Sequence, residues 1–177
     1  MILPLSEVGV RIVPKLLDKI FIYPTDTIYG IGCDAEKKEL VKKIKKIKKR
    51  KQKSFSIIVP SKEYILRNFV ITKKGIDKYL PGPYTLILKK KNPEFLKHVS
   101  GNRFIGVRIP AHPLTKILQK TGKPIVSTSV NISGEKPAKK IKEINRDILK
   151  EVELVIDGGN LPGKPSVLIK KERAIER

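Results

Sequence analysis

The chain has 177 residues, of which 40% are hydrophobic, enough to bury one core and to predict a single domain over residues 1–177. Its 39 basic and 17 acidic residues give a net charge of +22, which favours a polyanionic partner such as nucleic acid or a nucleotide, although a lysine-rich thermophile surface would look the same. A single cysteine excludes an internal disulfide, two histidines argue against a zinc site, and no apolar run is long enough to span a membrane. We therefore expect a cytoplasmic protein that contacts no membrane.

Apolar runs rich in β-branched residues alternate with helical patterns along the chain. In chain order we predict helix 8–19, strand 21–23, helix 36–50, strand 56–59, helices 61–68 and 73–80, strands 86–88 and 105–109, helix 113–121, strand 125–129, helix 139–152 and strand 154–156. This mixture predicts an α/β domain with a mixed sheet. No internal repeat and no long linker interrupts it.

Lys48 occupies a position where a folded core does not need a charge. The apolar residues of segment 36–50 follow helical spacing, and Lys48 lies only about 40° around that helix from Ile44, inside the apolar stripe. We therefore expect its ammonium group to pass the edge of the core and enter a functional site. The alternative is a lysine at the helix end whose charged head returns to solvent.

Two loops carry more polar groups than packing requires. Residues 24–30 leave a strand with two threonines and an aspartate before a glycine, which suits either a small polar ligand or an ordinary turn. Residues 127–134 end a strand with four hydroxyl groups and an amide, and such strand ends often line ligand crevices in α/β sheets. Both loops are candidate binding segments.

Arg108 is the third candidate, because it lies in a strand made otherwise of core residues. A buried guanidinium needs an anion, either a protein carboxylate or the carboxylate or phosphate of a ligand. The chain contains neither a Walker phosphate-binding loop nor the Gly-x-Ser-x-Gly elbow of serine hydrolases. A bound nucleotide would therefore be held by scattered Lys, Arg, Ser and Asn side chains.

Five motifs in order resemble the YrdC/Sua5 family of threonylcarbamoyl-AMP synthases: Pro-Thr-Asp-Thr-Ile-Tyr-Gly at 24–30, Lys-Lys-Arg at 48–50, Pro-Gly-Pro-Tyr-Thr at 81–85, Val-Arg-Ile-Pro at 107–110 and Ser-Val-Asn-Ile-Ser-Gly at 129–134. The resemblance covers nearly the whole chain. It implies a YrdC-like fold, a twisted mixed β-sheet flanked by helices around a basic concave cavity. It also implies the single-domain form, without the additional C-terminal Sua5 domain.

The resemblance implies an enzyme, a nucleotidyltransferase that makes L-threonylcarbamoyladenylate from L-threonine, bicarbonate and ATP, releases pyrophosphate and uses Mg²⁺ with the ATP. The product would pass to the tRNA threonylcarbamoyl transferase machinery, which modifies adenosine 37 of tRNA. Attack on the α-phosphorus builds negative charge that Lys48, Arg50 and the divalent metal would offset. Positioning and electrostatics, rather than a tuned base, would then supply the rate.

The family's roles transfer to particular residues. The resemblance assigns catalysis to Lys48 and Arg50, threonine binding to Thr27, Arg108, Ser129 and Ser166, and ATP binding to Arg50, Lys53, Asn131, Lys139 and Arg177, with no metal ligand on the protein.

Three departures from the family pattern affect these assignments. Lys51 follows Arg50 where the family has proline, and residues 138–140 read Ala-Lys-Lys where the family often has Ser-Pro-Thr. The family's late Arg-x-Gly is missing, so that either Arg173 or Arg177 would supply the last phosphate contact, and we prefer Arg177.

Two other functions compete with the synthase. The charge would equally suit a module that binds double-stranded RNA or tRNA without turnover, and a synthase could itself contact tRNA. A carbamoyl-transfer module of larger maturation proteins would carry similar motifs. An RNA binder should spread its basic residues over an outer face, whereas an enzyme should gather Lys48, Arg50, Arg108 and the Ser/Asn run around one cavity.

Overall fold

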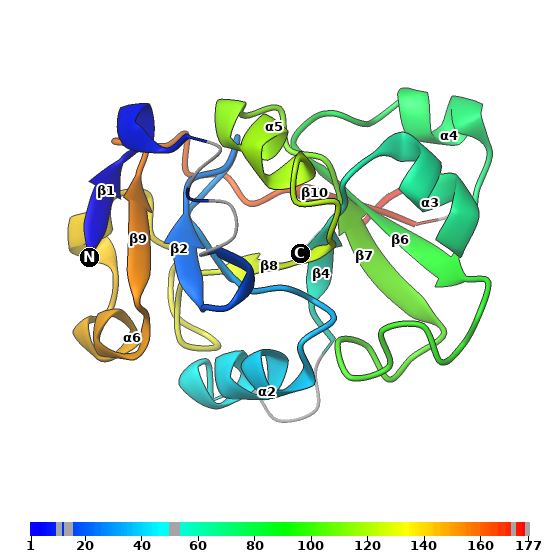
Figure 1. Ribbon diagram of the computed structural model, residues 1–177. Helices are drawn as coiled ribbons and strands as arrows, with labels where there is room; N and C mark the ends of the chain where they lie inside the picture. The colour runs from blue at the N-terminus through cyan, green and yellow to red at the C-terminus, as the bar shows by residue number, and fades with distance from the viewer. Residues whose placement is uncertain (10–11, 13–15, 50–53, 171–172, 176–177) are drawn as a thin grey trace.

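The computed structural model describes residues 1–9, 12, 16–49, 54–170 and 173–175. Within them, eleven strands form a twisted mixed sheet in the order β1-β9-β2-β3-β8-β4-β7-β6-β10-β11, with β5 beside β6 (Figure 1). The strands are β1 (Ile2–Pro4), β2 (Phe21–Tyr23), β3 (Gly30–Gly32), β4 (Ser56–Ile58), β5 (Phe69–Val70), β6 (Tyr84–Lys90), β7 (Phe104–Arg108), β8 (Ile125–Ser129), β9 (Leu154–Asp157), β10 (Val167–Lys170) and β11 (Arg173–Ile175).

Short helices cover both faces of this sheet. They are α2 (Lys38–Ile47), α3 (Lys62–Asn68), α4 (Lys73–Asp77), α5 (Pro113–Gln119) and α6 (Arg146–Glu151), together with 3₁₀ turns at Leu5–Glu7 and Ile141–Glu143. In Figure 1, α5 lies above the central strands, α2 lies below them, and α6 lies at the lower left below β9. Of the helices in the described ranges, none has the length and apolar character needed to cross a bilayer.

Two hydrophobic clusters, one on each face, explain why β2 and the first three residues of β9 are apolar without interruption. In β2, Ile22 points into the larger cluster, which α2, α3, α4 and α6 share, whereas Phe21 and Tyr23 point into the smaller cluster with α5. In β9, Val155 faces the larger cluster and its neighbours Leu154 and Ile156 face the smaller one. This alternation is the two-residue period of a strand buried on both faces.

The predicted α/β class and mixed sheet are confirmed, and each of the six predicted strands is present. The predicted helix over residues 139–152 is wrong in its first half. After the 3₁₀ turn the backbone extends at Ile144, and the Asn145 side chain then caps α6 by accepting a hydrogen bond from the Asp147 N–H. The predicted helix 36–50 ends at Ile47, and much of the predicted helix 8–19 lies outside the described residues.

Helix α5 begins with a histidine cap that should make folding pH-dependent. His112 Nδ1 accepts a hydrogen bond from the Leu114 N–H at 3.2 Å, and only a neutral imidazole has this acceptor. Burial lowers the pKa of His112, against the opposing effect of Asp26. Protons therefore bind the unfolded chain more readily, and stability is lost as the pH falls from the ordinary histidine pKa toward the lower folded value.

We expect the urea midpoint of the wild type to fall between about pH 7.5 and about pH 5 by more than that of His112→Asn, because asparagine caps without titrating. Equal falls in the two proteins would show that His112 does not contribute to the pH dependence.

Candidate active site

A row of small residues crosses the middle of the sheet and leaves a hollow above it. The strand register places Gly106 of β7 beside Ser56 of β4, and Ser56 beside Ser127 of β8. One strand further, Gly30 of β3 pairs with Ser129 of β8. A methyl group on Gly106 would lie 2.2 Å from Ser56 Oγ, so that glycine is needed for this close approach.

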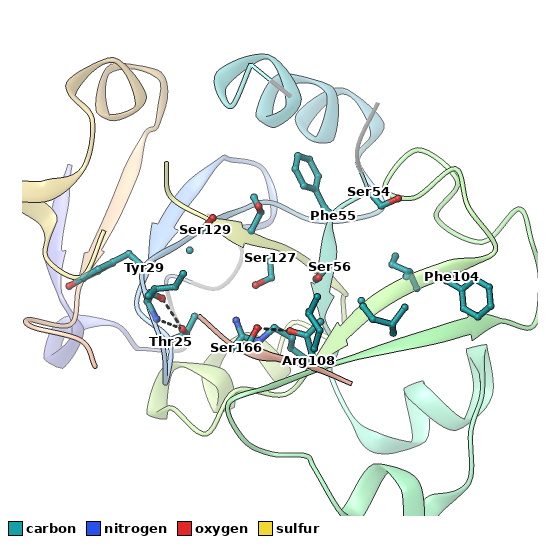
Figure 2. Close-up of a pocket in the computed structure, with 18 of the residues that line it drawn as sticks. Thr25, Tyr29, Ser54, Phe55, Ser56, Phe104, Arg108, Ser127, Ser129 and Ser166 are labelled. Carbon is teal, nitrogen blue, oxygen red and sulfur yellow. Dashed lines mark hydrogen bonds between the residues drawn. The ribbon is translucent and has the colours of Figure 1, made fainter. Parts of the chain in front are cut away.

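The hollow is a cavity of about 500 Å³, a size typical of small-molecule sites. Figure 2 shows Arg108, Ser166 and the hydroxyl groups of Ser56 and Ser127 around it. Nine of its 19 lining residues carry a hydroxyl group: Thr25, Tyr29, Ser54, Ser56, Thr85, Ser127, Thr128, Ser129 and Ser166. Among the described lining residues Arg108 is the one cation. The basic character expected for the whole cavity stays a prediction, because residues 50–53 are outside the described ranges.

Arg108 already has a protein carboxylate as a partner. Its Nη2 lies 3.0 Å from Asp26 Oδ1 and 3.2 Å from Thr27 Oγ1, and the two charged side chains are only 8% and 9% exposed. The other carboxylate oxygen, Oδ2, accepts a hydrogen bond from the Ala111 N–H at 2.8 Å. Loop 24–30 therefore fixes the guanidinium at the cavity wall, where Arg108 is also a lining residue.

The segment before β10 closes the cavity beside Arg108. Ser166 Oγ lies 2.7 Å from Thr85 Oγ1 of β6, and the N–H of the next residue, Val167, donates to Pro83 O. Strand β10 then runs parallel to β6. A serine far along the chain thus joins the arginine of β7 in one wall.

Tyr29 anchors another part of the wall. Its hydroxyl accepts from the Gly158 N–H at 2.9 Å, and its single hydrogen is shared between or directed to one of two acceptors, Asp157 Oδ1 at 3.1 Å and Gly159 O at 2.9 Å. Burial raises the pKa of Tyr29 to about 12, so that the phenol stays neutral at physiological pH. Tyr29 therefore offers the cavity a fixed ring rather than an acid–base group.

Lys48 is buried, as predicted, but it does not line the cavity. Its ammonium donates to Ser129 O, to Asn131 O at 2.7 Å and to Asn131 Oδ1 at 3.1 Å. Ser129 is a lining residue, and its hydroxyl donates to Asn131 Oδ1 at 2.5 Å. The lysine thus holds the end of β8, which carries the lining serine, and the segment that follows it.

The sequence-predicted residues fall into four groups. Arg108, Ser129 and Ser166 line one cavity, and each of Thr27, Lys48 and Asn131 hydrogen-bonds one of these lining residues. Lys139 is exposed: its carbonyl accepts from Leu161 N, and its side-chain carbons lie beside Gly163. The predictions for Arg50, Lys53 and Arg177 fall on residues outside the described ranges.

Sequence reasoning missed Ser54, Ser56 and Asn102, which also line the cavity. Ser56 had a signal, because a hydroxyl in a short apolar strand is out of place. Asn102 had no such signal in the sequence, because it lies in the long connection between β6 and β7, where a polar residue is expected. In the part of the chain that the structure describes, no three His, Cys, Asp or Glu side chains gather as a metal site.

Known proteins resemble this chain along most of its length. It is 41% identical over 159 residues to a "Putative threonylcarbamoyl-AMP synthase" of Methanocaldococcus jannaschii, covering 87% of this chain and 75% of that protein. It is 36% identical over 157 residues to a threonylcarbamoyl-AMP synthase of Pseudoalteromonas atlantica, covering 82% and 83%. The crystal structure of P. abyssi Sua5 complexed with L-threonine superposes with a TM-score of 0.85 at 26% identity.

That match covers 98% of this chain but 55% of the P. abyssi chain, so the chain spans about half of that protein. A protein-family model described as Sua5/YciO/YrdC, telomere recombination, matches residues 16–175. The fold, the order of the motifs and these matches agree, and the chain belongs to the Sua5/YciO/YrdC family.

Proposed function

We propose that this protein is an L-threonylcarbamoyladenylate synthase, a nucleotidyltransferase that converts L-threonine, bicarbonate and ATP into threonylcarbamoyl-AMP and pyrophosphate. The observation that carries the proposal is the convergence of Arg108, Ser129 and Ser166 on one hydroxyl-lined cavity, from three separate parts of the chain. The names of the relatives and the threonine complex of P. abyssi Sua5 support the same reaction.

The reaction needs no strong base at the cavity. The threonine amine first combines with bicarbonate to give an N-carboxy group and water. A carboxylate oxygen of that group attacks the α-phosphorus of ATP, the bond to the bridging oxygen breaks, and pyrophosphate leaves. Orientation of the two reactants and stabilisation of charge on the phosphates would supply most of the rate.

The cavity suits the amino acid at its Arg108 side. A guanidinium held at the wall by Asp26 can still receive the carboxylate of threonine, with Thr27 and Ser166 close by. Ser129 would face the group being built. ATP, entering as its Mg²⁺ complex, would meet Asn131, Lys139 and three residues outside the described ranges, Arg50, Lys53 and Arg177.

The wider setting is part of the same proposal. A threonylcarbamoyl adenylate is an activated acyl donor, and we assign it to the tRNA threonylcarbamoyl transferase machinery, which would complete t⁶A37 in the cytoplasm. Direct contact with tRNA or double-stranded RNA would use the net charge of +22. A purely RNA-binding function explains the charge but gives no role to a buried arginine beside a row of hydroxyls.

Pyrophosphate release from ATP in the presence of magnesium and bicarbonate tests the proposal. The assay compares L-threonine with L-serine, L-valine and no amino acid. We expect release that requires both threonine and bicarbonate and that rejects valine, which replaces the hydroxyl by a methyl group. No threonine-dependent release, alongside salt-sensitive binding to duplex RNA, would favour the RNA-binding module instead.

A further inference from the structure

The amide of Asn131 can lie in only one orientation. A lysine ammonium has three N–H donors and no acceptor, so that the amide atom 3.1 Å from Lys48 Nζ is the oxygen Oδ1. The nitrogen Nδ2 then faces the carbonyl oxygen of Glu135 at 2.6 Å, and a carbonyl oxygen can only accept. Two independent neighbours thus fix the same orientation of this amide.

That orientation determines the hydrogen bond between Ser129 and Asn131. Ser129 Oγ lies 2.5 Å from Asn131 Oδ1, and because Oδ1 carries no hydrogen, the serine hydroxyl must be the donor. A hydroxyl has one hydrogen and two lone pairs. With its hydrogen directed to Asn131, Ser129 offers its lone pairs to the cavity that it lines.

We propose that Lys48 is a positioning residue, which acts through Asn131 to make Ser129 Oγ a hydrogen-bond acceptor for an N–H group of the ligand. In the amino acid substrate that N–H belongs to the α-amine, or to the carbamate nitrogen formed from it. The inference rests on the proposed function and deepens it, because it names the ligand atom that Ser129 selects. It also replaces a direct contact between Lys48 and the phosphates by an action through the protein.

The environment of Lys48 supports this role. Lys48 is 1% exposed, and the carbonyl oxygens of Ser129 and Asn131 join Asn131 Oδ1 around its ammonium group. Lys48 is the C-cap residue of α2, where its N–H donates to Ile44 O, and the negative end of a helix dipole favours a cation. The three acceptor oxygens around Nζ match the three N–H donors of an ammonium group, and the hydrogen bonds therefore run in one direction, from Lys48 to Asn131 Oδ1 and from Ser129 Oγ to the same oxygen.

Calorimetric titration of the whole protein tests the inference without turnover. The probes are L-threonine and (R)-3-hydroxybutanoate, which keeps the carboxylate and the hydroxyl but lacks the amine. We expect Ser129→Ala, Lys48→Met and Asn131→Leu each to weaken threonine binding about tenfold, the loss of one hydrogen bond to a charged group. Binding of 3-hydroxybutanoate should change by less than about twofold, because it has no N–H for Ser129.

Two further variants separate positioning from direct contact. The double variant Lys48→Met/Ser129→Ala should bind threonine no more weakly than Ser129→Ala alone, since both changes interrupt one path. Asn131→Asp should lose less threonine affinity than Asn131→Leu, because its carboxylate still accepts from both Lys48 and Ser129, although it can no longer donate to the carbonyl oxygen of Glu135. If Lys48→Met does not fold, the comparison of Asn131→Leu with Asn131→Asp carries the same test.

Additive losses in the double variant would overturn the inference, because they would show that Lys48 acts on the ligand itself. Equal weakening of threonine and 3-hydroxybutanoate would also overturn it, because the missing contact would then not be to the amine. Absence of threonine binding to the wild type would overturn the proposed function and this inference together, whereas threonine binding with additive losses overturns the inference alone.

Discussion

Replacing Arg108 by methionine is expected to lower the free energy of unfolding by about 3 kcal/mol and to abolish threonine-dependent pyrophosphate release. The loss of stability comes from Asp26, whose carboxylate is 9% exposed and would keep, among its hydrogen bonds to described residues, the one from the Ala111 N–H. The loss of activity comes from the cavity wall, where Arg108 is the one cation among the described lining residues. Urea denaturation and the pyrophosphate assay measure the two effects separately.

The matched control removes the charge that Arg108 leaves behind. Asp26→Asn/Arg108→Met should recover at least about 1 kcal/mol of the lost stability, because a neutral amide costs less to bury than an unpaired carboxylate. It should not recover activity. Recovery of pyrophosphate release in the double variant would show that the arginine serves folding alone.

Gly32→Ala is the second change for which we expect a large effect, about 3 kcal/mol of destabilisation. Gly32 lies in β3 between β2 and β8, and a methyl group there would be 2.1 Å from the backbone oxygen of Val126 and 3.0 Å from the Tyr23 ring. A backbone oxygen inside a sheet cannot move aside as a flexible side chain can. The sheet would have to open locally, next to the strand that carries Ser129.

Gly101→Ala is the control, because a methyl group at Gly101 meets nothing within 4 Å, and its effect on stability should stay within about 0.5 kcal/mol. Urea denaturation of both variants measures the difference. If Gly32→Ala proved as stable as Gly101→Ala, the close packing of β3 against β8 would be wrong.

The strands with a strong apolar pattern could be predicted from sequence, whereas those made by pairing alone could not. Ile125–Ser129 and Leu154–Asp157 show apolar β-branched runs, and their predicted positions match the structure closely. Gly30–Gly32 has two glycines, which normally weaken a strand, and it forms because β2 and β8 hold it on both sides. The strand at Gly30–Gly32 therefore depends on pairing with its neighbours in the sheet, which local propensity does not reveal.

In the candidate site, too, local features could be predicted from the sequence and contacts between distant residues could not. Lys48 was predicted to be buried near a site because its angle on the helix is a local property. Its contacts with Ser129 and Asn131 are not local, since they join positions more than 80 residues apart. Ser56 was missed for the same reason, because its significance lies in the register that places it beside Gly106 and Ser127.

The wall that Ser166 forms with Thr85 has a consequence for synthesis on the ribosome. Strand β6 is made early, but β10, which pairs with its first half at Tyr84–Leu86, emerges only after some 80 further residues. Until then that half of β6 presents an open edge, the kind of surface that invites pairing with other chains. A nascent chain would therefore be most prone to aggregation just before its cavity can hold a ligand. Pairing of β10 with β6 would cover the open edge and complete the cavity wall in the same step.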